Sequence, residues 1–201
     1  MKRYVVGSQS ASLDWSRAPL LSDFRFPWES TPPPRTELRA VVHAGRLRFR
    51  FDCVDRELVL GEGATEKERV LGSDRVELFF ATSPQLNPYF CLEMDPRGLV
   101  YQYRARSYRQ FDDAPWAPEL EVHASLTAPH YRVEGSLPLA CLHAHGLLPS
   151  GGGELLAGAY RAELSRLPHG AVHFGWMSWV DPKTDKPDFH VPSSFGTWVF
   201  A

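Results

Sequence analysis

Residues 46–53, RLRFRFDC, constrain the fold more than any other stretch of this chain. Apolar residues at 47, 49, 51 and 53 alternate strictly with charged residues at 46, 48, 50 and 52. Because successive side chains of a β-strand point to opposite faces, this pattern predicts a strand with one buried and one wet face. The segment ELRAVVHA precedes it across Gly45. Residues 37–53 are therefore predicted to form a β-hairpin.

Strand-like segments continue to the end of the chain and give about ten strands in total. Beyond the hairpin they lie at 74–82, 88–95, 99–106, 119–127, 130–138, 155–164, 172–179 and 195–200. Short turns with Pro or Gly, such as DPRG at 95–98, favour antiparallel neighbours. We expect an all-β fold: one antiparallel β-sandwich, immunoglobulin-like or jelly-roll-like, with one or two short helices. LACLHAHGLL, 139–148, is the predicted helix.

Length and charge restrict the organisation and the partners. The 201 residues suffice for one domain spanning 1–201, and the 22 basic and 24 acidic residues are well mixed. This balance provides no basic surface for nucleic acid or for an anionic membrane. The N-terminal segment has only a three-residue apolar patch, so no signal peptide is predicted and a cytoplasmic location is expected. The three cysteines, an odd number and widely spaced, are expected to be free thiols.

The common catalytic motifs are missing from the sequence. It contains no GxSxG, HExxH, CxxC or GxxxxGK[ST] pattern. GEGATE, 61–66, lacks the third glycine of a dinucleotide loop, and the spacing in CLHAH, 141–145, would spread ligands around a helix rather than converge them. No catalytic residue is therefore assigned. A pair of catalytic carboxylates stays open, because its defining separation is spatial rather than sequential.

An acidic loop, VDPKTDKPD at 180–188, contains the candidate metal ligands. Asp181, Asp185 and Asp188 fall within nine residues, and calcium takes clustered loop carboxylates as ligands. Lys183 and Lys186 dilute that charge, so a solvated turn is the alternative. A structural calcium ion is the one cofactor that the sequence suggests.

Tryptophan is the residue type that points to a ligand. Five of the six tryptophans, including Trp176 and Trp179, fall in or beside irregular stretches. A single loop tryptophan often covers the core. Several together also suit saccharide binding, since an indole face packs against the C–H face of a sugar ring while nearby polar groups bind its hydroxyls.

The order of several segments resembles the family 9 carbohydrate-binding modules and their family 9-like relatives. The segments are SDRVELFF (73–80), YFCLEMDPRG (89–98), YRVEGSLPL (131–139), AYRAEL (159–164) and PDFHVPSSFGTWVF (187–200). The resemblance covers nearly the whole chain. It implies a β-sandwich similar to the DOMON type, a site that holds sugar chain ends between two aromatic rings, and structural calcium in some members.

The resemblance also implies particular site residues. Glu77 matches the glutamate of the family pattern, and Glu93 and Asp95 take the polar positions of the following strand, so together they would bind sugar hydroxyls. Phe189 falls where one aromatic clamp is expected, with His190 beside it. The position of the second clamp, commonly a tryptophan, is Leu71 here. Trp176 or Trp179 would then have to replace the missing ring.

Three hypotheses remain open from the sequence. The first is a non-catalytic carbohydrate-binding domain, in which Phe189→Ala and Glu77→Gln would weaken binding and leave the fold intact. The second is a carbohydrate-active hydrolase that uses a carboxylate pair such as Glu77 and Glu93 across the cleft. The third is a cytoplasmic interaction domain that has lost the sugar site, which the presence of Leu71 would favour.

Overall fold

The computed structural model describes residues 1–201 as thirteen strands, two α-helices and three short 3₁₀ turns. The strands are β1 (Arg3–Gln9), β2 (Leu20–Leu21), β3 (Thr36–His43), β4 (Arg46–Val54), β5 (Arg75–Ala81), β6 (Tyr89–Met94), β7 (Val100–Ala105), β8 (Phe111–Asp112), β9 (Glu121–Thr127), β10 (His130–Pro138), β11 (Gly153–Arg166), β12 (Val172–Ser178) and β13 (Gly196–Phe200). The helices are α1 (Glu66–Leu71) and α2 (Leu139–Ala144). No helix combines the length and the apolar character that crossing a membrane requires.

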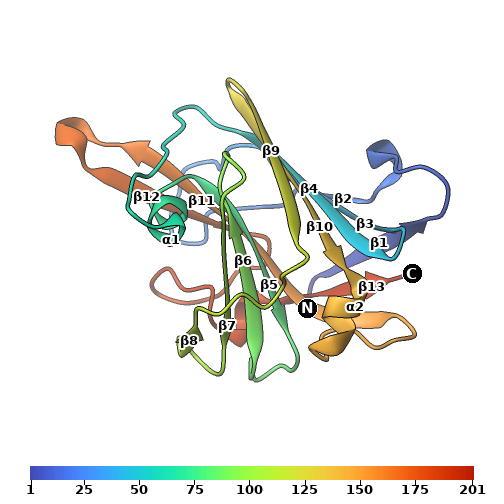
Figure 1. Ribbon diagram of the computed structural model, residues 1–201. Coiled ribbons are helices and arrows are strands. Elements are labelled where there is room, and N and C mark those ends of the chain that lie inside the picture. Colours follow the sequence, from blue (N-terminus) through green and yellow to red (C-terminus); the bar gives the residue numbers. More distant parts are fainter.

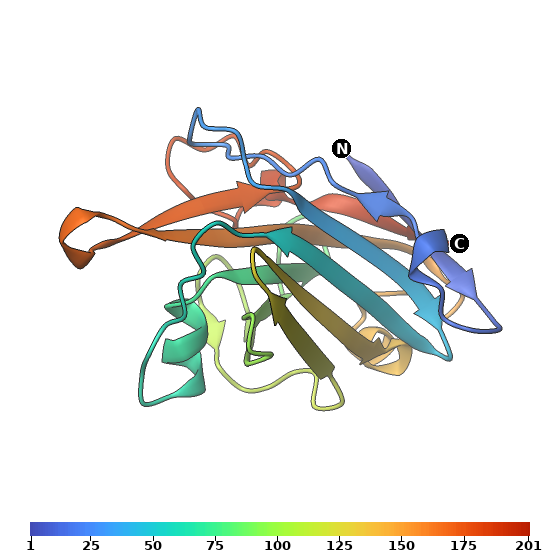
Figure 2. The same cartoon turned by 90° about the horizontal axis from the view of Figure 1, so that it is seen from above.

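The strands form two layers that are continuous through β1 (Figures 1 and 2). The front sheet has the order β8-β7-β6-β5-β11-β13, with β12 also paired to β11, and the back sheet has the order β3-β4-β10-β9, with β2 paired to β3. Strand β1 pairs with β13 through Arg3–Val6 and then with β3 through Gly7–Gln9. The result is an open β-sandwich, as predicted. Only the two pairings of β1 are parallel; the pairings between the other strands are antiparallel.

The alternating pattern that predicted β4 decides which side chains fill the space between the sheets. Leu47, Phe49 and Phe51 are fully buried there, and the intervening arginines lie on the outer face of the back sheet. Strand β5 is buried on both faces, because its outer side is also covered. Val76, Leu78 and Phe80 join the inner core, while Phe79 belongs to a second apolar cluster on the outside of the front sheet.

Ten of the strands correspond to the segments predicted from the sequence. The three additional strands are β1, β2 and β8, of which the last two contain two residues each. The predicted helix is present as α2, but it is shorter than 139–148. Helix α1 lies in a stretch expected to be irregular. Its capping box, in which Thr65 and Glu68 exchange hydrogen bonds with each other's backbone N–H groups, begins it.

The last strand, β13, lies in the interior of the sheet rather than at an edge. It pairs with β1 on one side and with β11 on the other, and its Trp198 is completely buried between the layers. The segment before it, 180–195, crosses the outer face of the front sheet. There Phe189 and Phe195 belong to the second apolar cluster with Tyr160 of β11. This covering segment and helix α1 enclose the candidate site.

Candidate ligand-binding site

A cleft of about 280 Å³ lies on the outer face of the front sheet. Strands β5, β6 and β7 form its floor, while α1, the β7–β8 turn, β12 and the segment 187–190 form its walls. Its lining residues are Lys67, Leu71, Arg75, Glu77, Glu93, Tyr101, Tyr103, Arg109, Phe111, Trp176, Pro187, Asp188, Phe189 and His190. The cleft thus combines aromatic rings with a small number of charged groups, as small-molecule sites commonly do.

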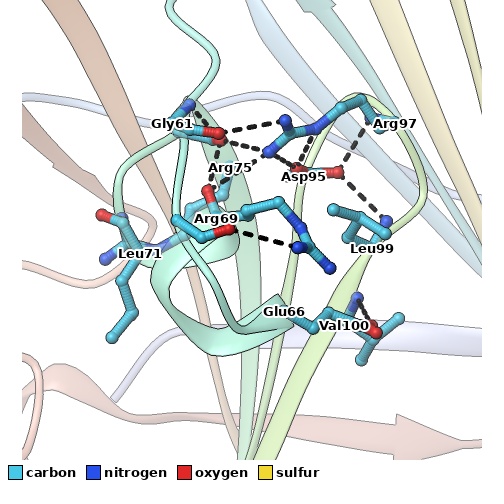
Figure 3. Close-up of polar contacts among 11 residues, drawn as sticks. Gly61, Glu66, Arg69, Leu71, Arg75, Asp95, Arg97, Leu99 and Val100 are labelled. Atoms are coloured by element: carbon cyan, nitrogen blue, oxygen red, sulfur yellow. Dashed lines mark hydrogen bonds and ion pairs between the residues drawn. The ribbon is translucent and has the colours of Figure 1, made fainter.

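Two carboxylates and one arginine form the floor of the cleft. Glu77 of β5 is paired in register with Glu93 of β6, so the two side chains lie next to each other on one face. Nε of Arg75 lies 2.9 Å from Oε1 of Glu77 and 2.7 Å from Oε2 of Glu93. All three side chains are almost completely buried. Nη1 of Arg75 also donates to the carbonyl oxygen of Leu71, 3.1 Å away, which ties the arginine to the end of α1 (Figure 3).

The two carboxylates differ in how their oxygens are bonded. Glu93 accepts hydrogen bonds from Nε of Arg75 and from the hydroxyl of Tyr103. Oε1 of Glu77 is buried and accepts no hydrogen bond, because the nearby Nε of Arg75 is directed at Glu93. Burial, and then the neighbouring charge of Glu93, raise the pKa of Glu77 despite the opposing effect of Arg75. Glu77 thus has an ion-pair contact with Arg75 but accepts no hydrogen bond, and a buried acceptor without a hydrogen bond is costly, so the carboxylate is available to a ligand donor.

Aromatic side chains surround this acidic floor. Trp176 of β12 is partly buried, and its ring meets the ring of Phe189 almost at a right angle, with 5.7 Å between the centroids. Phe189 itself stacks on Tyr160 with centroids 4.1 Å apart and planes 13° apart. One face of Phe189 is therefore occupied by the protein. From this burial we expect truncation of Phe189 to destabilise the fold, in contrast to the sequence-based expectation that Phe189→Ala leaves the fold intact.

His190 lines the cleft and is fixed by its neighbours. Its Nδ1 lies 2.9 Å from the hydroxyl of Tyr89, and its ring packs against Phe79 and Phe111. Burial, followed by the nearby charge of Arg109, lowers the pKa of His190 to about 4. The imidazole is therefore neutral near pH 7 and can act as a hydrogen-bond donor or acceptor.

Ion pairs neutralise the remaining charges at the mouth. Arg109 and Tyr108, from the β7–β8 turn, both donate to Asp188, at 3.2 Å and 2.8 Å. On the other side, Nζ of Lys67 lies 2.7 Å from Asp113 and above the ring of Tyr101. Asp188 thus joins two loops that border the cleft. The two cations at the mouth each have an acidic partner of their own.

The structure brings together most of the predicted ligand-binding residues. Glu77, Glu93, Trp176, Phe189 and His190 all line the cleft. Leu71 also lines it, at the position where the resemblance would place the second ring. Of the two tryptophans proposed to compensate, Trp176 lies in the cleft.

Trp179 does not line the cleft, so the prediction that its ring contacts the ligand is wrong. Its side chain is buried in the inner core, where it lies close to Gly196, so it offers no ring face to a ligand. Trp176 and Trp179 are three residues apart, and the period of two in a strand directs such residues to opposite faces.

Asp95 also lies outside the cleft. Its carboxylate accepts hydrogen bonds from the backbone N–H groups of Arg97 and Leu99 and from the guanidinium of Arg97, which in turn reaches Gly61 and Arg69 (Figure 3). Asp95 is completely buried. We therefore assign it to the β6–β7 turn and to the attachment of α1 rather than to sugar binding.

The three aspartates proposed for calcium are engaged separately. Asp181 accepts from the backbone N–H of Lys183, Asp188 binds Tyr108 and Arg109, and Asp185 is exposed. The structure contains no group of three or more His, Cys, Asp or Glu side chains arranged to hold a metal ion. The clustering expected for a calcium site at 181, 185 and 188 is thus not found.

Several cleft residues were not predicted from the sequence. Tyr101 and Tyr103 lie two residues apart in β7, so they share the face of the sheet that carries Glu93. The alternating pattern YQYRA indicates that the two tyrosines share a face. Only the pairing of Tyr101 with Glu93 shows that this face is the one with the cleft. Arg75 lies two positions before the predicted residue Glu77 in β5 and therefore points to the same face of the sheet. Lys67, Arg109 and Phe111 come from loops or short elements, where no period indicates direction.

The fold and the cleft together define a class of protein: a β-sandwich ligand-binding domain with its site on the outer face of one sheet. The sequence model of the family described as "Carbohydrate family 9 binding domain-like" matches residues 10–201, and this chain belongs to that family. A sequence search of curated proteins found no match.

Solved structures show the same fold at low sequence identity. A candidate carbohydrate-binding protein from Bacteroides uniformis superimposes with a TM-score of 0.79 at 17% identity, covering 100% of this chain and 99% of that one. A family 9 carbohydrate-binding module from Caldicellulosiruptor kristjanssonii in complex with glucose has a TM-score of 0.67 at 13% identity, covering 100% and 96%. A complex of such a module from the same organism with cellotriose gives 0.68 at 14%, covering 99% and 93%.

Proposed function

We propose that this chain is a non-catalytic domain that binds a saccharide in the cleft of the front sheet. The observation that carries the proposal is the carboxylate of Glu77, which accepts no hydrogen bond and belongs to a residue that lines an aromatic cleft. A sugar hydroxyl would supply the missing donor, and Trp176 would contact the ring. Family membership and the sugar complexes of two structural neighbours support this choice.

The polar groups of the cleft fit a ligand with many hydroxyls. Glu77 offers an acceptor, and neutral His190 offers a nitrogen not used by Tyr89. Such groups orient a ligand, while Trp176 and Phe111 provide apolar surface. With few hydrogen bonds and a small contact area, we expect an affinity no tighter than about micromolar.

No specific observation favours the hydrolase. Glu77 and Glu93 lie side by side on the floor and contact the same nitrogen of Arg75, so they do not face each other across a space for a sugar ring. Glycoside hydrolysis by two carboxylates needs them on opposite sides of the scissile bond. The arrangement suits binding better than cleavage.

The experiment is a calorimetric titration with mono- and oligosaccharides, glucose and cellotriose included. Glu77→Gln and Trp176→Ala should each weaken binding by roughly tenfold or more, about the worth of one charge-assisted hydrogen bond or one stacking contact. Matched controls are Glu134→Gln and Trp15→Ala, because both residues lie away from the cleft on or beside the back sheet. The proposal fails if no sugar in a broad panel gives heat or a shift in melting temperature.

A further inference from the structure

The charges on the floor of the cleft do not balance. Two carboxylates, Glu77 and Glu93, contact one guanidinium, and both contact the same Nε of Arg75. The other cations that line the cleft, Lys67 and Arg109, are bound at the mouth by Asp113 and Asp188. The floor therefore has one carboxylate more than it has cations, and water screens these buried groups only weakly. Burial and the neighbouring Glu93 accordingly raise the pKa of Glu77 to about 8, so a proton takes the place of the missing cation in the absence of a ligand.

The excess carboxylate and the carboxylate without a hydrogen bond are the same residue, Glu77. Glu93 has a partner for each carboxylate oxygen, whereas Glu77 accepts no hydrogen bond although its side chain is only 3% exposed. A neutral hydroxyl would provide a single donor and no charge. An ammonium group would provide three donors and a second positive charge beside the two carboxylates, in place of the proton that Glu77 otherwise holds.

The surroundings of Glu77 also suit a cation. Trp176, Tyr101 and Tyr103 line the same cleft, and aromatic faces attract cations through the ring quadrupole. The protein already uses this contact, with the guanidinium of Arg75 5.3 Å from the centroid of Trp176 and Nζ of Lys67 4.7 Å from that of Tyr101.

We propose that the cleft prefers a saccharide bearing a free amine, with the ammonium group on Glu77. This inference rests on the proposed function and specifies its ligand class: amino sugars over the neutral sugars of the same ring shape. The amine replaces a single hydroxyl, so the aromatic and polar contacts of the remaining ring are retained.

The experiment compares three isosteric pairs by calorimetry at about pH 7, where an aliphatic amine is protonated and its ammonium group displaces the proton of Glu77 at only a small cost. The pairs are glucose and glucosamine, galactose and galactosamine, and mannose and mannosamine. In at least one pair the amino sugar should bind about tenfold more tightly or better, the worth of one charge-assisted contact. N-acetylation, which removes the charge, should abolish the advantage.

The Glu77→Gln variant and added salt distinguish a specific contact from general attraction. Glu77→Gln should bind the amino sugar and its neutral partner equally, while Glu134→Gln should keep the preference. The preference should also persist at high salt, since attraction to surface charges would be screened. Equal or tighter binding of the neutral sugars overturns the inference and leaves the proposed function standing, as does a preference that Glu77→Gln retains. If neither the amino sugars nor the neutral sugars bind, both this inference and the proposed function fail.

Discussion

Two buried clusters of one arginine and two carboxylates lie on opposite faces of the front sheet. Arg75 of β5, with Glu77 and Glu93, faces the cleft. Arg161 of the neighbouring strand β11 faces the interior, where it pairs with Asp55 at 2.8 Å near Asp74. The residue types are nearly the same. The two clusters differ in the hydrogen bonds that their carboxylate oxygens accept. This difference distinguishes a candidate ligand site from a structural contact.

In the interior cluster every carboxylate oxygen has a partner. Asp55 binds Arg161 and the backbone N–H of Glu57, and Asp74 accepts from the backbone N–H groups of Val59 and Leu164. The guanidinium of Arg161 also donates to Thr36 and to the carbonyl of Val54, so it joins the two sheets. In the cleft, by contrast, Glu77 accepts no hydrogen bond. The interior cluster holds the fold, and the cleft cluster keeps an acceptor free.

The largest expected effect comes from breaking the interior cluster. Arg161→Met would leave Asp55 buried without its counter-charge, which typically costs about 3–5 kcal/mol of the free energy of unfolding. Urea denaturation measures the loss. Arg132→Met is the control, because the pair of Arg132 with Asp52 is exposed and should contribute at most about 1 kcal/mol. Equal losses in the two variants would contradict the structural role of Arg161.

Phe189→Ala tests whether a residue that lines the cleft also stabilises the fold, because Phe189 belongs to the second apolar cluster. Phe189 is 6% exposed and stacks on buried Tyr160, so its removal leaves a cavity and should cost about 3 kcal/mol. The measurement is the same denaturation experiment, with Phe111→Ala as control because Phe111 is 44% exposed. A Phe189→Ala variant with unchanged stability would show that this ring serves the ligand alone, as the sequence suggested.

Local sequence patterns predict some of these features and not others. The alternation of residues 46–53 predicted β4 correctly, since the period of a strand is local information. The same period could have excluded Trp179, which lies three residues from Trp176. Helix α1 had a visible capping pair, Thr65 and Glu68, but six residues carry little periodic signal.

The composition of the cleft was harder to predict because it depends on strand pairing. Glu77 and Glu93 were identified from the family resemblance, but their contact follows from the register of β5 against β6. Arg75 shares their face through the same register. Arg109 and Lys67 reach the cleft from a turn and a short helix, whose positions are fixed by tertiary contacts such as the Arg109–Asp188 pair.

A pH-dependent effect on stability is expected from His190. Its pKa is about 4 in the fold, compared with 6.5 for the ordinary side chain. Between these values the unfolded chain binds a proton that the folded chain does not, so stability falls as the pH falls from about 6.5 to about 4. His190→Gln should show a shallower fall over this range in thermal melts. Parallel curves for the two proteins would indicate that His190 is not held neutral by its surroundings.

The most direct test of the comparison is the stability of two isosteric variants, Glu77→Gln and Asp55→Asn, measured side by side by urea denaturation. Asp55→Asn removes the charge that Arg161 and the backbone bind, and should cost about 1–3 kcal/mol. Glu77→Gln removes a carboxylate that accepts no hydrogen bond and repels Glu93, so the free energy of unfolding should stay within about 0.5 kcal/mol or rise. A loss in Glu77→Gln as large as that in Asp55→Asn would show that Glu77 is structural and would contradict its assignment to a ligand.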